Sequence, residues 1–175
     1  LSGDMEKNGD DQILKIDSDQ VCELSENMIP TGNFIDVSDT VFDMRKGRVI
    51  SDGINEGHPQ FAITRAYDHP FALNRSGVRG EPEIVLYSPH SGVEMEVCTT
   101  ERAVVVYTGN YLDDVSVFDS GYNKIPKKEK NERYLGVAIE TQDFPNGINE
   151  RKFRVKLLEK GKEYYQKTIF KFNIK

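Results

Sequence analysis

The sequence has no long apolar run, no excess of positive charge and almost no cysteine. Its longest clean apolar runs span about five residues, as in Ala103–Tyr107, whereas a bilayer-crossing helix needs about 20. This excludes a membrane span, and the polar first residues, Leu1–Asp4, predict no signal peptide. The net charge of −6 argues against a nucleic-acid partner, because nonspecific affinity for phosphates comes from excess Lys and Arg.

The side chains that bind metals or form disulfides are few. Two cysteines, Cys22 and Cys98, cannot build a disulfide framework, and we expect two reduced thiols in a cytoplasmic protein. The histidines, His58, His69 and His90, lack the spacing of a zinc site, so no metal is predicted. The first residue is Leu and not Met, which indicates a cut, processed or partial chain.

The residues that are present predict one globular domain over residues 1–175 that is all-β. Hydrophobic residues make up 37% of the chain, enough to form a core. Apolar and polar residues alternate with a period of two, as in half-buried strands, and no window has a convincing helical stripe. We therefore predict an antiparallel sandwich or barrel without long helices. The expected strands are Val93–Thr99, Phe153–Leu157, Phe170–Ile174, Gln12–Ile16, Gln60–Thr64, Ile84–Tyr87, Ala103–Tyr107 and Leu135–Ile139. Ala103–Tyr107 and Leu135–Ile139 lack polar alternation, which predicts that these two strands are buried on both faces.

Two carboxylates stand out as candidates for chemistry. Glu140 follows the apolar run 135–139, and desolvation at the end of a buried strand would raise its pKa toward that of a general base. Asp68 lies between aromatic residues, an arrangement suited to accepting hydrogen bonds from sugar hydroxyls. From the local pattern alone, a solvated glutamate and an aspartate that caps the turn before Pro70 explain the same residues.

A series of short motifs resembles the aldose 1-epimerases, or galactose mutarotases, from end to end of the chain. Each motif is weak alone, but their order and spacing are specific. They are Leu24–Gly32, Phe42–Lys46, Tyr67–Phe71, Ser91–Gly92, Thr99–Thr100, Tyr107–Asn110 and Glu140–Pro145.

The resemblance implies a large galactose mutarotase-like β-sandwich, of which this chain is the C-terminal part. It also implies that an aldohexose is the substrate and that its α and β anomers are interconverted without a cofactor. In this family a glutamate takes the proton of the anomeric hydroxyl while a histidine protonates the ring oxygen. The matching motifs place the catalytic base at Glu140 and a substrate-binding carboxylate at Asp68.

The departures from the family pattern concern the acid and the sugar. The resemblance places the family's acid histidine just before Leu1, and His69 is the one candidate replacement. A glutamine common in the family is Val105 here, and its P-D-A-x-N segment is 145–149, P-N-G-I-N, so the preferred sugar stays open. We also expect a chain of this kind to need an N-terminal half or to self-associate, because missing strands leave open edges.

Two other functions remain open at this stage. The chain could be a sugar-binding sandwich that holds its ligand through Asp68 without catalysis. It could also resemble the sister group that acts on hexose phosphates, but that reading needs basic residues near Asp68 and Glu140, and the sequence has no such cluster there.

Overall fold

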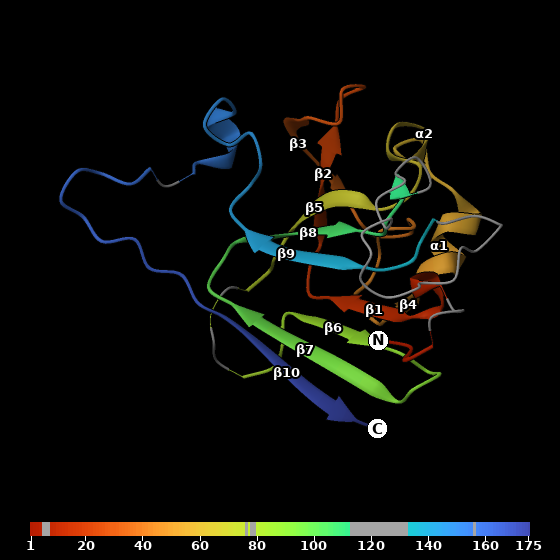
Figure 1. Cartoon of the computed structure of the whole chain (residues 1–175). Coiled ribbons are helices and arrows are strands. Elements are labelled where there is room, and N and C mark those ends of the chain that lie inside the picture. The colour runs from red at the N-terminus through yellow and green to blue at the C-terminus, as the bar shows by residue number, and fades with distance from the viewer. Residues whose placement is uncertain (5–7, 76, 78–79, 113–132, 156) are drawn as a thin grey trace, which may run out of the picture.

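The structure is a computed structural model that describes residues 1–4, 8–75, 77, 80–112, 133–155 and 157–175. Ten strands within these ranges form two five-stranded sheets, arranged as a sandwich (Figure 1). The first sheet has the order β10-β7-β6-β1-β4 and the second the order β3-β2-β5-β8-β9. Every pair of neighbouring strands is antiparallel. The predicted all-β antiparallel sandwich is therefore confirmed.

The strands and the helical segments of the described residues are all short, with at most seven residues each. The first sheet consists of β1 (Ile13–Ile16), β4 (Arg48–Val49), β6 (Ile84–Tyr87), β7 (Val93–Thr99) and β10 (Thr168–Ile174). The second consists of β2 (Gln20–Leu24), β3 (Pro30–Asp36), β5 (Asp68–Ala72), β8 (Ala103–Tyr107) and β9 (Ala138–Gln142). The helical segments are α1 (Ile50–Glu56), α2 (Phe61–Thr64), η1 (Gly9–Asp11) and η3 (Arg151–Phe153). Across the described ranges, no helix has the length and apolarity that crossing a bilayer requires.

The core lies between the two sheets and extends under the helices. Strand β8 runs through the second sheet between β5 and β9, and its β-branched residues suit a strand covered on both faces. Residues 103–106 are all buried, as the absence of polar alternation predicted. The largest buried side chains include Phe42, Tyr67, Phe71 and Phe153.

Several expected strands are observed where the alternation placed them. Ile84–Tyr87, Val93–Thr99 and Ala103–Tyr107 have the predicted bounds. The strand expected at Gln12–Ile16 begins one residue later, and the C-terminal strand begins at Thr168, two residues before Phe170.

The strand expected at Gln60–Thr64 is wrong, because this segment forms helix α2. Phe61 and Thr64 are the buried pair, three residues apart, which is the spacing of a helix face. At the end of β2, the side-chain amide of Gln60 makes the hydrogen bonds that the backbone of a neighbouring strand would otherwise make. Its Oε1 accepts from the Leu24 amide at 2.8 Å, and its Nε2 donates to the Leu24 carbonyl at 3.2 Å.

Two further expectations are wrong or shifted. Phe153 ends the short helix η3, and its ring packs on Phe34 and Phe144. Of the strand expected at Phe153–Leu157, the described residues 153–155 and 157 are not in a strand, and residue 156 lies outside the described residues. The run 135–139 contributes only its end to β9, which begins at Ala138. Burial on both faces also fails there, because β9 is the edge strand of the second sheet and Leu135 is 38% exposed.

Candidate active site

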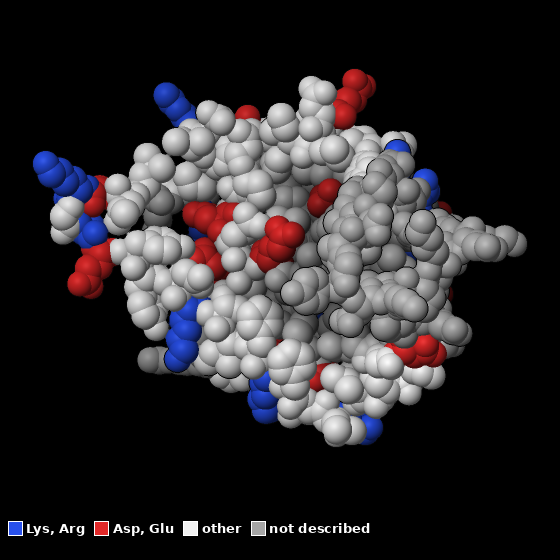
Figure 2. Space-filling model, in the orientation of Figure 1, with Lys and Arg blue, Asp and Glu red and all other residues white. Residues whose placement is uncertain are grey.

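The sheet register places Asp68 and Glu140 on the same face of the second sheet. Asp68 lies opposite Tyr107, and Val105, two residues back along β8, lies opposite Glu140. Directly paired residues share a face, as do residues two apart along a strand. We call the face that carries Asp68, Val105, Tyr107 and Glu140 the acidic face; the residues between them point into the core. Figure 2 shows acidic side chains in the middle of the molecule over β8 and β9.

The register also sets the distance between the two carboxylates. Asp68 is two strands from Glu140 across the sheet and two residues away along it. With a strand spacing of about 4.8 Å and a rise of about 3.4 Å per residue, their Cα atoms lie about 12 Å apart. Both side chains leave the sheet on the same side.

The carboxyl group of Asp68 is partly shielded from water, and its pKa is raised. It is half-buried at the start of β5, and this burial is the larger of two causes that raise its pKa from 3.8 to about 6. The negative charge of Glu140 is the smaller cause. The two carboxyl groups therefore interact across β8, and Asp68 gains or loses its proton in the physiological range.

Glu140 lies in a different environment from the one expected. It is the middle residue of β9 and its side chain is exposed, because the strand runs three residues further than the apolar run suggested. The predicted desolvation at the end of a buried strand is therefore wrong. The nearest polar neighbour on its own strand is Gln142, whose Nε2 donates to Glu140 Oε2 at 3.4 Å.

A buried polar clasp fixes the backbone immediately before Asp68. The Asn110 side chain donates from Nδ2 to two carbonyls, that of Tyr67 at 2.8 Å and that of Thr64 at 2.9 Å. Thr108 Oγ1 donates to the Tyr67 carbonyl at 3.2 Å. Asn110 and Thr108 are both buried, so these bonds are shielded from water. The sequence pattern predicts no role for residues 107–110 beyond their part in the resemblance.

The side chain of Tyr67 anchors the same segment from the core. Its hydroxyl donates to the Val41 carbonyl at 2.7 Å, and its ring packs edge-on against Phe61 and Phe42. Helix α1 approaches this hydroxyl so closely that only a glycine fits: a Cβ atom on Gly53 would lie 1.9 Å from the Tyr67 oxygen. Asp68 is thus positioned by contacts on both sides of the preceding residue.

His69, the candidate replacement for the family's acid histidine, lies away from the acidic face. It is fully buried and points into the core, 4.8 Å from the Phe42 ring, on the opposite side of the sheet from Asp68. Its Nδ1 accepts from the Asp68 amide at 3.2 Å, and its Nε2 has no hydrogen-bond partner. Burial, with a smaller contribution from His58, lowers the pKa of His69 to about 3. The imidazole is therefore neutral at physiological pH and out of reach of a sugar on the acidic face.

The other two histidines also lie away from the acidic face. The His58 ring packs against Phe42 at 4.9 Å, and burial lowers its pKa. His90 lies beyond β6, where its Nε2 is 3.8 Å from an Asp4 carboxylate oxygen. None of the three histidines is therefore placed to protonate a sugar between Asp68 and Glu140.

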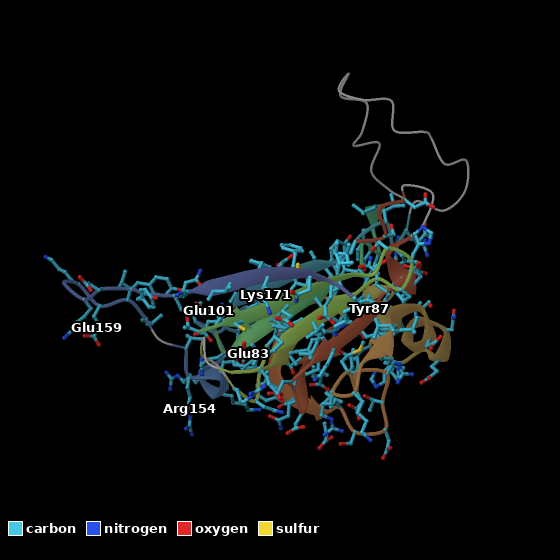
Figure 3. All side chains as sticks on the ribbon, turned by 90° about the horizontal axis from the view of Figure 1, so that it is seen from below. Glu83, Tyr87, Glu101, Arg154, Glu159 and Lys171 are labelled. Carbon is cyan, nitrogen blue, oxygen red and sulfur yellow. The ribbon has the colours of Figure 1, made fainter. Side chains whose placement is uncertain are left out.

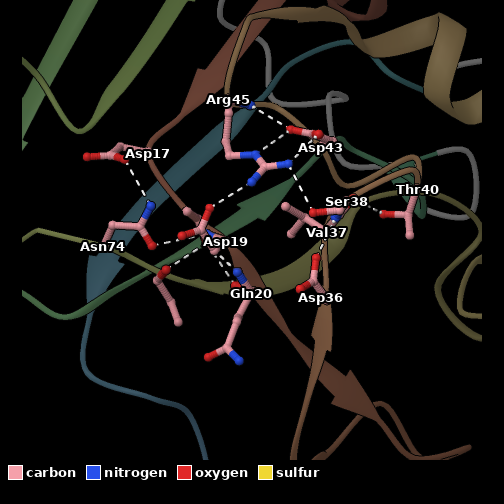
Figure 4. A network of polar contacts seen from close by, with 12 residues as sticks. Asp17, Asp19, Gln20, Asp36, Val37, Ser38, Thr40, Asp43, Arg45 and Asn74 are labelled. Atoms are coloured by element: carbon pink, nitrogen blue, oxygen red, sulfur yellow. Dashed lines mark hydrogen bonds and ion pairs between the residues drawn. The ribbon is translucent and has the colours of Figure 1, made fainter.

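The motif at residues 42–46 is structural. The Arg45 guanidinium holds both oxygens of Asp43, at 2.9 and 2.7 Å, and also reaches Asp19 at 2.9 Å and Ser38 at 3.2 Å (Figure 4). Hydrogen bonds from Arg45 hold the pKa of Asp43 below its usual value. Phe42 is buried in the core of the same motif. This network ties the long loop after β3 to the start of β2.

The sequence is similar to that of known sugar epimerases. The family model described as aldose 1-epimerase matches residues 1–171. Galactose mutarotase of Sus scrofa is 33% identical over 176 residues, which cover 99% of this chain and 47% of the pig protein. Aldose 1-epimerase of Haemophilus influenzae is 30% identical over 164 residues, which cover 93% of this chain and 45% of that protein.

Solved structures show the same architecture. A GalM/aldose epimerase homologue from C. elegans matches 95% of this chain with a TM-score of 0.73 at 21% identity, over 47% of its own length. Galactose 1-epimerase from Lactobacillus acidophilus matches 96% of this chain with a TM-score of 0.71 at 25% identity, over 45% of its length. The fold is thus a mutarotase-type β-sandwich.

The chain belongs to the aldose 1-epimerase family, as the match over residues 1–171 shows. This confirms the resemblance drawn from the motifs. The chain spans about half the length of the curated relatives that it matches.

Proposed function

We propose that this chain supplies the base and a substrate-binding carboxylate of an aldose 1-epimerase, which interconverts the α and β anomers of a free aldohexose. The observation that carries the proposal is that both motif carboxylates, Asp68 and Glu140, share one face of a family member's sheet at a separation that suits one sugar. The names of the relatives, galactose mutarotase and aldose 1-epimerase, support the substrate class.

The proposed reaction needs one proton taken and one proton given. Glu140 accepts the proton of the anomeric hydroxyl, the bond between the anomeric carbon and the ring oxygen breaks, and the ring oxygen receives a proton. The open aldehyde rotates about its bond to the next carbon, and the reverse steps close the ring on the other face. Asp68 accepts hydrogen bonds from sugar hydroxyls and fixes the ring relative to Glu140.

The donor of the second proton is proposed to lie in the half of the relatives that this chain does not match. No described histidine faces the sugar site, so within this chain Asp68 and Glu140 account for binding and proton removal. The same observation favours a second candidate function, in which the chain alone binds sugar without catalysis. A hexose-phosphate substrate is less well supported, because Asp68, Val105, Tyr107 and Glu140 offer a phosphate no positive charge.

We propose that the protein works in the cytoplasm. Cys22 and Cys98 are both free thiols, and Cys22 is buried in the core, where burial raises its pKa to about 12. Unpaired thiols are typical of reducing compartments.

Sugar binding should weaken as the pH falls through 6. The pKa of Asp68 is raised to about 6, and the ionised carboxylate is the form that accepts hydrogen bonds. One pH unit below this pKa only about a tenth of the groups are ionised, so we expect the affinity for D-galactose to fall about tenfold between pH 7 and pH 5. Proton NMR titration of the sugar at each pH measures the dissociation constant.

Two matched variants test whether the pH dependence of sugar binding comes from Asp68. Asp68→Asn should bind the sugar more weakly than the wild type at pH 7 and lose the dependence on pH between 5 and 7. Asp39→Asn, an identical exchange at an exposed loop position after β3, should behave as the wild type. A wild-type affinity that is constant from pH 5 to pH 7, or an Asp68→Asn variant that binds normally, would contradict the proposed role.

A further inference from the structure

The Tyr107 side chain lies beside both carboxylates of the acidic face, yet the proposed reaction gives it no role. The register places it directly opposite Asp68 of β5 on one side and opposite Ala138 of β9 on the other. Cβ atoms of directly paired residues are about 5 Å apart. Glu140 lies two residues along β9 from Ala138, which makes it the diagonal neighbour of Tyr107. A sugar held by Asp68 would therefore lie next to Tyr107.

The Tyr107 hydroxyl accepts a hydrogen bond but does not spend its own proton. The Tyr111 backbone amide donates to the Tyr107 oxygen at 3.1 Å. In the part of the chain that the structure describes, no oxygen or nitrogen accepts the proton of this hydroxyl in return. A phenol oxygen that accepts one hydrogen bond still has one to donate. Because Tyr107 is only half-buried, the proton is available to a molecule on the acidic face.

Contacts of the Tyr111 side chain fix the direction of this hydroxyl. The Tyr111 hydroxyl donates to the Ile63 carbonyl at 3.1 Å and lies 3.4 Å from Met28 Sδ. The guanidinium carbon of Arg65 lies 4.6 Å from the centre of the Tyr111 ring, which is a cation–π contact. These contacts restrict the Tyr111 backbone, and with it the amide that holds the Tyr107 oxygen in place.

The turn that carries Tyr111 also positions Asp68. This turn follows β8 and contains Thr108 and Asn110, whose side chains donate to the Tyr67 carbonyl immediately before Asp68. One short segment therefore sets both the backbone that carries the carboxylate and the orientation of the hydroxyl opposite it. Because the hydrogen bonds of Thr108 and Asn110 are buried, the two groups keep their relative position.

Asp68 and Tyr107 offer the two kinds of partner that sugar hydroxyls need. A sugar hydroxyl both donates and accepts, whereas the ionised Asp68 carboxylate can only accept. Sugar oxygens next to Asp68 therefore still have lone pairs to satisfy, which the Tyr107 proton can do. Gln142 is also a donor on this face, but its Nε2 lies 3.4 Å from Glu140 Oε2, at the other carboxylate. Tyr107 is the donor that lies opposite Asp68.

We propose that Tyr107 is a further substrate-binding residue, whose hydroxyl donates a hydrogen bond to a hydroxyl of the sugar held by Asp68. The inference rests on the proposed function, because it needs a sugar at Asp68. It assigns one end of the sugar to β5 and β8 together and leaves the anomeric end to Glu140 on β9. A sugar that lacks this hydroxyl leaves the Tyr107 proton without a partner and is bound more weakly.

The test is a proton NMR titration of D-galactose with the whole chain at pH 7, for the wild type and for Tyr107→Phe. This exchange removes the hydroxyl and keeps the ring, so we expect the dissociation constant to rise about three- to tenfold, the usual contribution of one neutral hydrogen bond. Tyr87→Phe is the matched control and should bind as the wild type does. Tyr87 is also half-buried, but it lies on β6 in the first sheet (Figure 3).

A series of singly deoxygenated D-galactoses distinguishes a direct contact from a structural effect. The derivative that lacks the hydroxyl bound by Tyr107 should bind equally weakly to the wild type and to Tyr107→Phe, because the two changes remove the same hydrogen bond. Every other derivative should bind more weakly to Tyr107→Phe. A loosened site would instead weaken the binding of all derivatives by the same factor. By circular dichroism, Tyr107→Phe should melt within a few degrees of the wild type.

The outcomes separate this inference from the proposed function. A Tyr107→Phe chain that binds D-galactose as tightly as the wild type would overturn the inference and leave the roles of Asp68 and Glu140 untouched. A loss of the same size for every derivative would overturn it as well. A wild-type chain that binds neither D-galactose nor any derivative would contradict the inference and the substrate-binding role of Asp68 together.

Discussion

Replacing Glu140 by Gln in a complete-length protein that carries this chain should lower the rate of anomerisation by about 10²–10⁴-fold, the usual contribution of a positioned acid or base. The amide keeps the size of the side chain and one accepting oxygen, but it cannot accept a proton at neutral pH. The measurement is polarimetry on freshly dissolved α-D-glucose or α-D-galactose, with the spontaneous rate subtracted.

Two comparisons make the result specific to the base. Sugar binding should change much less than turnover in Glu140→Gln, because the hydroxyl contacts come mainly from Asp68 and from the other half of the protein. Asp68→Asn should show the opposite pattern and weaken binding at least as much as turnover. If Glu140→Gln kept a near-normal turnover number, Glu140 would not be the general base.

Replacing Gly53 by Ala should destabilise the chain by about 3 kcal/mol. The added methyl group would lie 1.9 Å from the Tyr67 hydroxyl, which must then leave its buried hydrogen bond with the Val41 carbonyl. The better helix propensity of Ala offsets about 1 kcal/mol of the cost. For a chain of this size we expect the melting temperature to fall by about 6–12 °C, measured by circular dichroism.

Gly136 provides the control for this substitution. A Cβ atom there has no neighbour within 4 Å, so Gly136→Ala should leave the melting temperature nearly unchanged. An equally stable Gly53→Ala variant would mean that helix α1 moves away from Tyr67 at little cost. The clasp around residue 67 would then be looser than its hydrogen bonds suggest.

Part of the fold was predictable from alternation. Apolar and polar residues alternate along Val93–Thr99, and the observed bounds of this strand follow from that pattern. Strand β5 was missed because it begins with Asp68 and contains Pro70, which removes a backbone donor. The proline is tolerated because β2 pairs with β5 only at Phe71 and Ala72 and has no residue opposite Pro70.

The candidate site was predictable only through the resemblance. From the local pattern, Glu140 and Asp68 are explained equally well as a solvated glutamate and a turn cap, and no spacing rule connects residues 72 positions apart. Their proximity arises from the pairing of β5, β8 and β9, which depends on the whole sheet. The expected burial of Glu140 failed for the same reason, since β9 is an edge strand. The direction of His69 depends on the register of β5, which the sequence pattern did not reveal.

The two ends of β10 are held by different numbers of contacts, and this difference should appear in amide hydrogen exchange. At its start, the Thr168 hydroxyl shares hydrogen bonds with Thr99 and Thr141, one in each sheet, whereas the strand ends at the exposed Ile174. Local opening begins where few apolar contacts hold the backbone, so exchange should be fastest at the end of β10 and slowest in β8. Because β8 joins the strands of Asp68 and Glu140, the spacing of the two carboxylates should survive fluctuations that already expose the β10 edge.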